Sequence, residues 1–204
     1  MSALDDARLY FVVEAGASDR LLDEALAGGC DVLQLRDHGA SDDELVAAAE
    51  RFRDACDRHG ALFVVNDRPE IALEAGADGV HVGQDDLPVD AVRRLVGPDL
   101  VIGLSTHAPE QFDAGLASGA DYLSVGPIWE TPTKAGRPAA GLDYVRYAAA
   151  HARKPWFAIG GIDEHNLGQV VAAGATRAVV VRAIRDAADP RAAASALKSR
   201  LSVD

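Results

Sequence analysis

The sequence predicts an α/β fold, a single (β/α)8 TIM barrel domain spanning residues 1–204. Short apolar runs alternate with helical patterns along the whole chain, which implies a parallel sheet. The runs are apolar on both sides, as strands buried on both faces must be. About eight such units within 204 residues favour a compact closed barrel over an open, doubly wound sheet.

We expect the eight strands at residues 8–13, 31–35, 61–65, 79–82, 100–103, 122–125, 156–159 and 178–181. The clearest intervening helix begins at Ser41, where Ser-x-x-Glu forms a capping-box pattern. Pro88 and Pro109 stand where the first turn of a helix is expected. A weak repeat supports the alternation, because glycine turns at 27–31, 75–78, 118–121 and 173–176 precede every second strand. Glycine there predicts a left-handed helix C-cap.

Composition limits the possible partners. The net charge is −12, and so acidic a surface disfavours binding to nucleic acid. No apolar run approaches the ~18 residues of a membrane span. Cys30 and Cys56 are expected to be buried, reduced thiols, and the N-terminus lacks a signal-peptide pattern, so we expect a cytoplasmic protein. The sequence does not indicate an oligomeric state, and a homo-oligomer stays open.

Polar and glycine residues gather after the predicted strands. In a (β/α)8 barrel the active site lies at the carboxyl ends of the strands, so this rim is the expected site. In strand order the rim residues include Gln34, Arg36 and His38; Asn66 and Asp67; Asp85 and Asp86; Ser105 and His107; Thr131, Thr133 and Lys134; Gly160 and Gly161; and Arg182.

Asp67 and Asp86 are the predicted metal ligands. They follow different strands but converge on one rim, where like charges resist joint ionisation unless a cation neutralises them. Oxygen ligands without a Cys or His cluster point to Mg²⁺ rather than zinc. Asp85 is expected to be a solvated turn residue.

Arg36 and Lys134 are the strongest candidates for binding phosphate, Arg as a bidentate donor and Lys as a point charge. Thr131 and Thr133 flank a stiff loop within residues 126–140 and are possible hydroxyl donors. Phosphate sites after the seventh and eighth strands are frequent in this fold. Two sets of backbone amides are therefore further candidates, those of Gly160–Gly161 and those around Val181 and Arg182.

At these positions the chain resembles the thiamine phosphate synthase family over nearly its whole length. Each matching stretch is weak alone, but seven in family order are specific together. The stretches are Gln34-Leu-Arg36-Asp37, Asn66-Asp67-Arg68, Gly79 through Asp86, Gly103-Leu-Ser105-Thr-His107, Ala120 through Ile128, Thr131-Pro-Thr133-Lys134 and Ala158 through Ile162.

The resemblance implies a reaction in which a hydroxymethylpyrimidine pyrophosphate loses pyrophosphate and a thiazole phosphate nitrogen attacks the exposed methylene carbon. Thiamine phosphate and pyrophosphate are the products, and the path is dissociative. It also implies roles: Asp67 and Asp86 for Mg²⁺; Arg36, Asn66 and Lys134 for pyrophosphate; Gln34 for the pyrimidine; Ser105 near the reacting groups; and Thr131, Thr133, Gly161, Val181 and Arg182 for the thiazole phosphate.

The chain departs from the family pattern at two positions. His38 stands where the family usually has lysine, and Arg182 where a small hydroxyl residue is common. Because an unperturbed histidine loses its charge near pH 6.5, we expect activity to fall more steeply above neutral pH than in a lysine-bearing relative. Arg182 either adds a phosphate contact or is a solvated surface residue.

Two alternatives stay open. A sister barrel, the thiazole tautomerase, shares the phosphate site and a Ser-x-His like that of Ser105 and His107, with His107 as an acid–base group. It lacks the Asn-Asp pair that this chain has at Asn66 and Asp67. A non-catalytic barrel that only binds thiazole or thiamine phosphate is the second alternative, and His38 is the feature in its favour.

Overall fold

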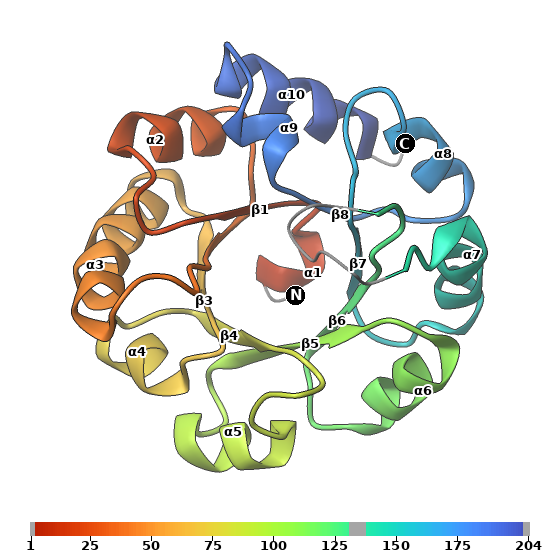
Figure 1. Cartoon of the computed structure of the whole chain (residues 1–204), viewed down its shortest axis with the longest axis horizontal. Helices are drawn as coiled ribbons and strands as arrows, with labels where there is room; N and C mark the ends of the chain where they lie inside the picture. Colours follow the sequence, from red (N-terminus) through yellow and green to blue (C-terminus); the bar gives the residue numbers. More distant parts are fainter. Residues whose placement is uncertain (1–2, 131–137, 202–204) are drawn as a thin grey trace.

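The computed structural model describes residues 3–130 and 138–201, and it is a closed barrel of parallel strands (Figure 1). Each strand pairs with the next along the chain, and the last pairs with the first. The predicted fold is therefore confirmed. The strands are β1 (Leu9–Val13), β2 (Val32–Leu35), β3 (Leu62–Asn66), β4 (Gly79–Val82), β5 (Val101–Thr106), β6 (Tyr122–Val125), β7 (Trp156–Ile159) and β8 (Ala178–Val180).

Helices accompany the strands, and all of them except α1 surround the barrel, as Figure 1 shows. They are α1 (Ala3–Asp6), α2 (Asp19–Ala27), α3 (Asp42–His59), α4 (Pro69–Glu74), α5 (Val89–Val96), α6 (Pro109–Ala117), α7 (Gly141–His151), α8 (Leu167–Ala172), α9 (Arg182–Arg185) and α10 (Pro190–Leu201). Ser41 and Glu44 form the predicted capping box of α3, and Pro109 is in the first turn of α6. Pro88 lies one residue earlier than expected, directly before α5.

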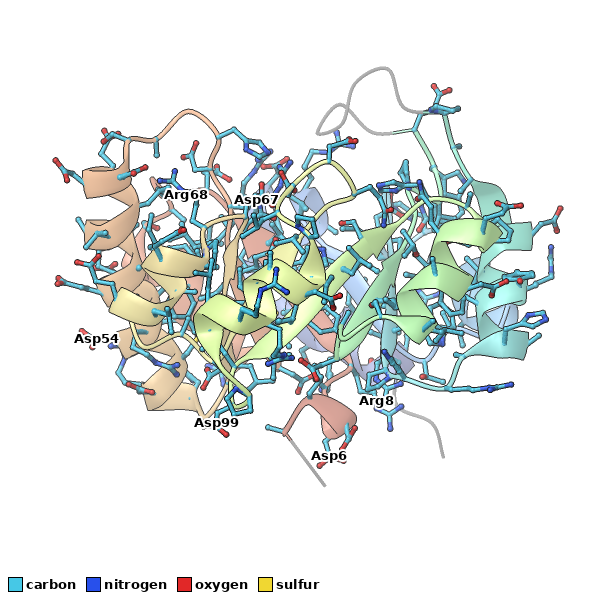
Figure 2. The ribbon with its side chains drawn as sticks, turned by 90° about the horizontal axis from the view of Figure 1, so that it is seen from below. Asp6, Arg8, Asp54, Asp67, Arg68 and Asp99 are labelled. Atoms are coloured by element: carbon cyan, nitrogen blue, oxygen red, sulfur yellow. The ribbon has the colours of Figure 1, made fainter. Side chains whose placement is uncertain are left out.

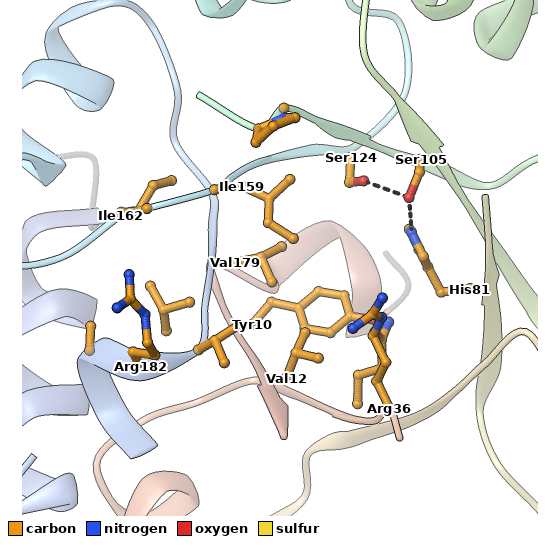
Figure 3. A pocket seen from close by; sticks show the side chains of 18 of the residues that line it. Tyr10, Val12, Arg36, His81, Ser105, Ser124, Ile159, Ile162, Val179 and Arg182 are labelled. Atoms are coloured by element: carbon orange, nitrogen blue, oxygen red, sulfur yellow. Dashed lines mark hydrogen bonds between the residues drawn. The ribbon is translucent and has the colours of Figure 1, made fainter. Parts of the chain in front are cut away.

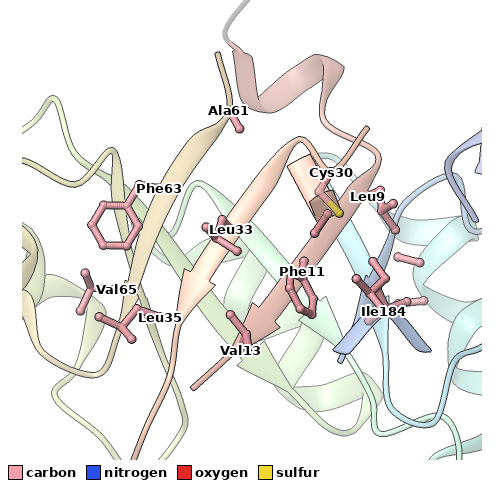
Figure 4. Packing of buried hydrophobic residues seen from close by; sticks show 14 of the residues in the cluster. Leu9, Phe11, Val13, Cys30, Leu33, Leu35, Ala61, Phe63, Val65 and Ile184 are labelled. Carbon is pink, nitrogen blue, oxygen red and sulfur yellow. The ribbon is translucent and has the colours of Figure 1, made fainter. Parts of the chain in front are cut away.

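Side chains of each strand alternate between two apolar layers. Leu9, Phe11 and Val13 of β1 point outward and pack under the helices, as Figure 4 shows. Tyr10 and Val12 of the same strand point into the barrel. This alternation is the two-sided burial that the apolar runs predicted.

Helix α1 closes one end of the barrel. It lies at the centre of the ring in Figure 1, and Leu4 packs against the inner layer. Figure 2 shows Asp6 of this helix at the end opposite Asp67. The helix was not predicted, because four residues are too few to show a periodic apolar pattern. Because one end is plugged, a ligand enters the barrel interior from the other end, where the strands end.

The glycine-turn repeat corresponds to a repeated carboxylate contact at the starts of β2, β4 and β6. Asp31, Asp78 and Asp121 each accept a backbone N–H from the preceding strand; the donors are Leu9, Phe63 and Ile102 at 2.9, 2.7 and 2.7 Å. Each also pairs with a cation from a helix: Lys198, Arg53 and Arg93 respectively. A carboxylate between a strand and a helix therefore fixes how the two pack.

Two expectations need correction, and the expectation for the cysteines is confirmed. Strand β5 ends at Thr106, not at residue 103, so Ser105 belongs to the strand and not to the loop after it. Glycines 29, 76 and 174 have the expected positive φ, but Gly119 does not. Both cysteines are buried and free, as expected. Within the described ranges, no helix is long and apolar enough to cross a membrane.

Candidate active site

A cavity of about 340 Å³ opens at the carboxyl ends of the strands (Figure 3). The predicted site residues that line it come from β2, β3, β5 and the segments after β7 and β8. They are Gln34, Arg36, Asn66, Ser105, Gly161, Val181 and Arg182. Thr131, Thr133 and Lys134, to which we assigned phosphate binding, lie outside the described residues.

One wall of the cavity is apolar. This wall is formed by Val12, Ile159, Ile162 and Val179. Figure 3 shows Val12 and Val179 between Arg36 and Arg182. A flat, uncharged ring fits against such a wall, because burying apolar surface is favourable and needs no polar partner. The cavity therefore combines an apolar middle with cationic and polar groups at its margins.

A buried series of hydrogen bonds forms the floor of the cavity. Gln34 Nε2 donates to the Tyr10 hydroxyl at 2.6 Å, and that hydroxyl lies 2.9 Å from the hydroxyl of Tyr122. The Tyr122 hydroxyl is 3.0 Å from Nδ1 of His81, and Nε2 of His81 is 2.9 Å from Ser105 Oγ. Burial raises the pKa of both tyrosines, so both keep their protons and can donate.

Asp67 and Asp86, the predicted metal ligands, lie together at the rim. Burial is the main cause that raises the pKa of Asp67 to about 6, and the hydrogen bond and charge of Asp86 add to it. Arg36 and Asn66 act in the opposite direction but do not cancel the effect. The raised pKa means that the ionised form of Asp67 is destabilised. A divalent metal bound beside the two carboxylates would stabilise that form.

Backbone contacts hold both carboxylates in place. Asp67 has a left-handed φ of 61°, and its N–H donates to the carbonyl of His81 at 2.8 Å. The Asp86 carboxylate accepts the N–H of Gly83 at 2.8 Å. Within the described ranges, no cluster of three or more His, Cys, Asp or Glu side chains gathers as a metal site. Two carboxylates fit Mg²⁺, which keeps several waters and takes further oxygens from phosphates.

Arg36 and His38 are in contact beside this pair. Arg36 Nη2 donates to His38 Nε2 at 2.6 Å, because a guanidinium can only donate. The other ring nitrogen, Nδ1, lies 4.0 Å from the Asp67 carboxylate. His38 therefore lies between Arg36 and the Asp67 carboxylate, and its side chain is 63% exposed.

The opposite margin of the cavity is built from backbone. Gly160 and Gly161 have φ of 108° and 67°, which L-residues with side chains rarely adopt. A Cβ on Gly160 would come within 2.5 Å of Pro127 Cα. Asn166 Nδ2 donates to the Gly161 carbonyl at 2.7 Å and holds the turn. Glycine is therefore required here for a close approach of backbone, the geometry in which amides bind anions.

Among the polar cavity residues that lie within strands, four escaped the sequence analysis as site residues: Tyr10, His81, Tyr122 and Ser124. They lie within β1, β4 and β6, and the rim criterion considered only residues after the strands. A polar side chain at an inward position of an apolar strand was the available signal. His107, a predicted rim residue that was given a role only in the tautomerase alternative, also lines the cavity, and its Nδ1 donates to the Gly126 carbonyl at 2.6 Å.

Comparisons with known proteins agree on one family. The family model described as "Thiamine monophosphate synthase" matches residues 9–184. The "Thiamine-phosphate synthase" of Thermobifida fusca is 57% identical over 97% of this chain and 94% of its own length. That of Acidothermus cellulolyticus is 54% identical over 98% and 97%.

Solved structures give the same result. "Thiamine phosphate pyrophosphorylase" from Pyrococcus furiosus superposes with a TM-score of 0.90 at 29% identity, covering 98% of each chain. A structure of 3-hexulose-6-phosphate synthase, at 20% identity and a TM-score of 0.67, shares the barrel fold. The matches to thiamine phosphate synthases cover almost the whole chain. The chain belongs to the thiamine monophosphate synthase family, whose members are transferases.

Proposed function

We propose that this chain condenses 4-amino-2-methyl-5-hydroxymethylpyrimidine pyrophosphate with 4-methyl-5-(2-phosphoethyl)thiazole, or its carboxylated form, to give thiamine phosphate and pyrophosphate. Family membership supports the activity. The observation that carries the choice of substrates is the shape of the cavity, whose apolar middle lies between two margins. At the arginine–carboxylate margin Arg36 lines the cavity and lies beside Asp67 and Asp86, which are outside the lining itself; at the other margin the lining is glycine backbone. Two ring compounds, each bearing phosphate, match those two margins.

In this proposal the arginine–carboxylate margin binds the pyrophosphate. Asp67 and Asp86 hold Mg²⁺, and the raised pKa of Asp67 supports a cation at this place. Bound there, Mg²⁺ supplies positive charge that neutralises the leaving pyrophosphate. Arg36 lines the cavity beside the pair and donates to the same oxygens. Asn66 adds an amide from the last residue of β3.

The other parts of the cavity position the rings. Gln34 reaches the pyrimidine, and Ser105 donates to the group that leaves. The amides of Gly161, Val181 and Arg182 bind the thiazole phosphate, and Thr131, Thr133 and Lys134, outside the described residues, complete the phosphate contacts. Bond breaking leads bond making, so stabilising the leaving charge supplies most of the catalysis and no nucleophilic side chain is needed.

Metal dependence tests this proposal and separates it from the tautomerase alternative. We expect thiamine phosphate to form with Mg²⁺ and to fall to background with EDTA. Asp67→Asn and Asp86→Asn should lower kcat by ~100-fold or more, because a preorganised charge at the leaving group is lost. Asp85→Asn, a change of an exposed neighbour, is the matched control and should keep activity. Turnover that survives EDTA would contradict the metal assignment.

A further inference from the structure

The strand register brings His81 and Tyr122 into contact across a glycine. Gly103 of β5 pairs with His81 on β4 and with Tyr122 on β6. A Cβ on Gly103 would overlap His81 Nδ1 and the Tyr122 hydroxyl. Because Gly103 has no side chain, the Tyr122 hydroxyl on β6 can reach Nδ1 of His81 on β4, across the intervening strand β5. Any larger residue at this position breaks that contact.

Donor and acceptor capacities give this buried series a direction. The Gln34 amide nitrogen donates to Tyr10, so the Tyr10 proton goes on to the Tyr122 oxygen. Tyr122 then donates to Nδ1 of His81, which must carry a lone pair. The neutral ring has its proton on Nε2 and donates it to Ser105 Oγ.

The series ends at a hydroxyl that faces the cavity. Ser105 Oγ accepts from His81 Nε2 at 2.9 Å and from Ser124 Oγ at 3.4 Å, as Figure 3 shows. Its two lone pairs are then used, and its own proton is the group left to donate to a ligand. In this direction the protons of Tyr10, Tyr122 and His81 Nε2 all have acceptors within the series. A doubly protonated imidazole would instead leave the Tyr10 proton without an acceptor within the series.

We propose that Tyr10, Tyr122 and His81 are positioning residues that fix His81 as the Nε2–H tautomer and thereby direct the Ser105 hydroxyl proton at the substrate. The inference deepens the proposed function and rests on it for the identity of that substrate. The hydroxyl is held in advance as a donor toward the leaving pyrophosphate and needs no reorientation during the reaction. The tautomer itself is a property of the ligand-free protein.

The tautomer is measured directly by ¹⁵N NMR of the ligand-free protein with labelled histidine, at a pH at which histidine is neutral. His81→Gln identifies the His81 signals among the six histidines. We expect the Nε2–H pattern in the wild type and a mixture of tautomers in Tyr122→Phe. Because this readout needs no turnover, it stays informative if the proposed reaction fails. A wild-type Nδ1–H pattern would overturn the inference, since Ser105 would then donate to His81.

Kinetics test whether Tyr122 acts through Ser105. Ser105→Ala should lower kcat by ~100-fold, the cost of one preorganised donor. Tyr122→Phe should lower kcat by about 5- to 10-fold with little change in KM, the fold-change that one neutral hydrogen bond is worth. Added to Ser105→Ala, it should change kcat by less than ~2-fold. An equal loss in both backgrounds would show that Tyr122 acts by another route and would refute the inference.

Tyr144→Phe is the matched control. Tyr144 is also a buried tyrosine, but its hydroxyl donates to Thr106 Oγ1 at 2.7 Å and it does not line the cavity. This variant should keep both the wild-type kcat and the His81 tautomer. Gly103→Ala provides a second route to the same break: it keeps both side chains, but its Cβ pushes the His81 ring and the Tyr122 ring apart, so it should also mix the tautomers.

Discussion

Replacing Asp67 with asparagine should stabilise the metal-free protein while removing its metal site. The pKa of Asp67 is raised from 3.8 to about 6, mainly by burial and then by Asp86. Because the folded pKa lies above the unfolded one, ionisation of Asp67 favours unfolding. The penalty is absent below pH ~4, grows between pH ~4 and ~6, and is complete above that range.

The expected gain follows from the size of the shift. About two pKa units correspond to ~3 kcal/mol, at ~1.4 kcal/mol for each unit. The Asp67 side chain is 23% exposed, so solvent screening reduces this figure, and we expect Asp67→Asn to raise the free energy of unfolding by about 1–2 kcal/mol at pH 7.5. Asparagine also tolerates the left-handed φ of 61° at this position, so the substitution adds no backbone strain.

Urea unfolding in EDTA, at pH 7.5 and at pH 4, measures this effect. The gain should be present at pH 7.5 and vanish at pH 4, where Asp67 is protonated in the wild type. A better backbone fit of asparagine would instead give the same gain at both pH values. Asp85→Asn is the control and should change stability by less than ~0.5 kcal/mol. A variant no more stable than the wild type at pH 7.5 would refute the reasoning about this carboxylate pair.

Further predictions concern three other positions. His38→Lys should flatten the fall of activity above neutral pH, and an identical pH–rate profile would rule out a role for His38 charge. Arg182→Ala should raise KM for the thiazole phosphate by about 3- to 10-fold at unchanged kcat, whereas a solvated Arg182 predicts no change. Asp78→Ala should cost ~2–3 kcal/mol, because it removes the acceptor of the Phe63 N–H and the ion-pair partner of Arg53 Nη1; thermal or urea unfolding checks this. Asp57→Ala, which removes only an exposed partner of Arg53, should cost less than ~1 kcal/mol.

The fold was predictable because each strand is buried on both faces, whereas the helices around the barrel are buried on one face only. Two-sided apolar runs such as residues 122–125 differ from the helical pattern of α3, and their alternation leaves few arrangements of the chain. The carboxyl end of β5 was missed for a physical reason. Ser105 and Thr106 are polar, and their burial is compensated by neighbours such as Ser124, whose carbonyl accepts from Thr106 Oγ1 at 2.8 Å. A single sequence does not reveal such partners.

The site was predictable at its rim and not in its interior. Residues such as Arg36 and Asp86 follow strands directly, so strand order alone brings them to one end of the barrel. The contact between His81 and Tyr122 depends on register, because the two residues meet only when both are opposite Gly103. The apolar pattern predicts which face of each strand is buried, but these strands are apolar on both faces, so the pattern does not show which residue lies opposite which.

Pyrophosphate release from the purified protein tests the central claim most directly. The protein is given Mg²⁺ with both substrates, with each substrate alone, and with both substrates plus EDTA. We predict release only when both substrates and the metal are present, together with an equal amount of thiamine phosphate. Substrates that bind without any release of pyrophosphate would contradict the proposed synthase activity and favour a barrel that only binds thiazole phosphate.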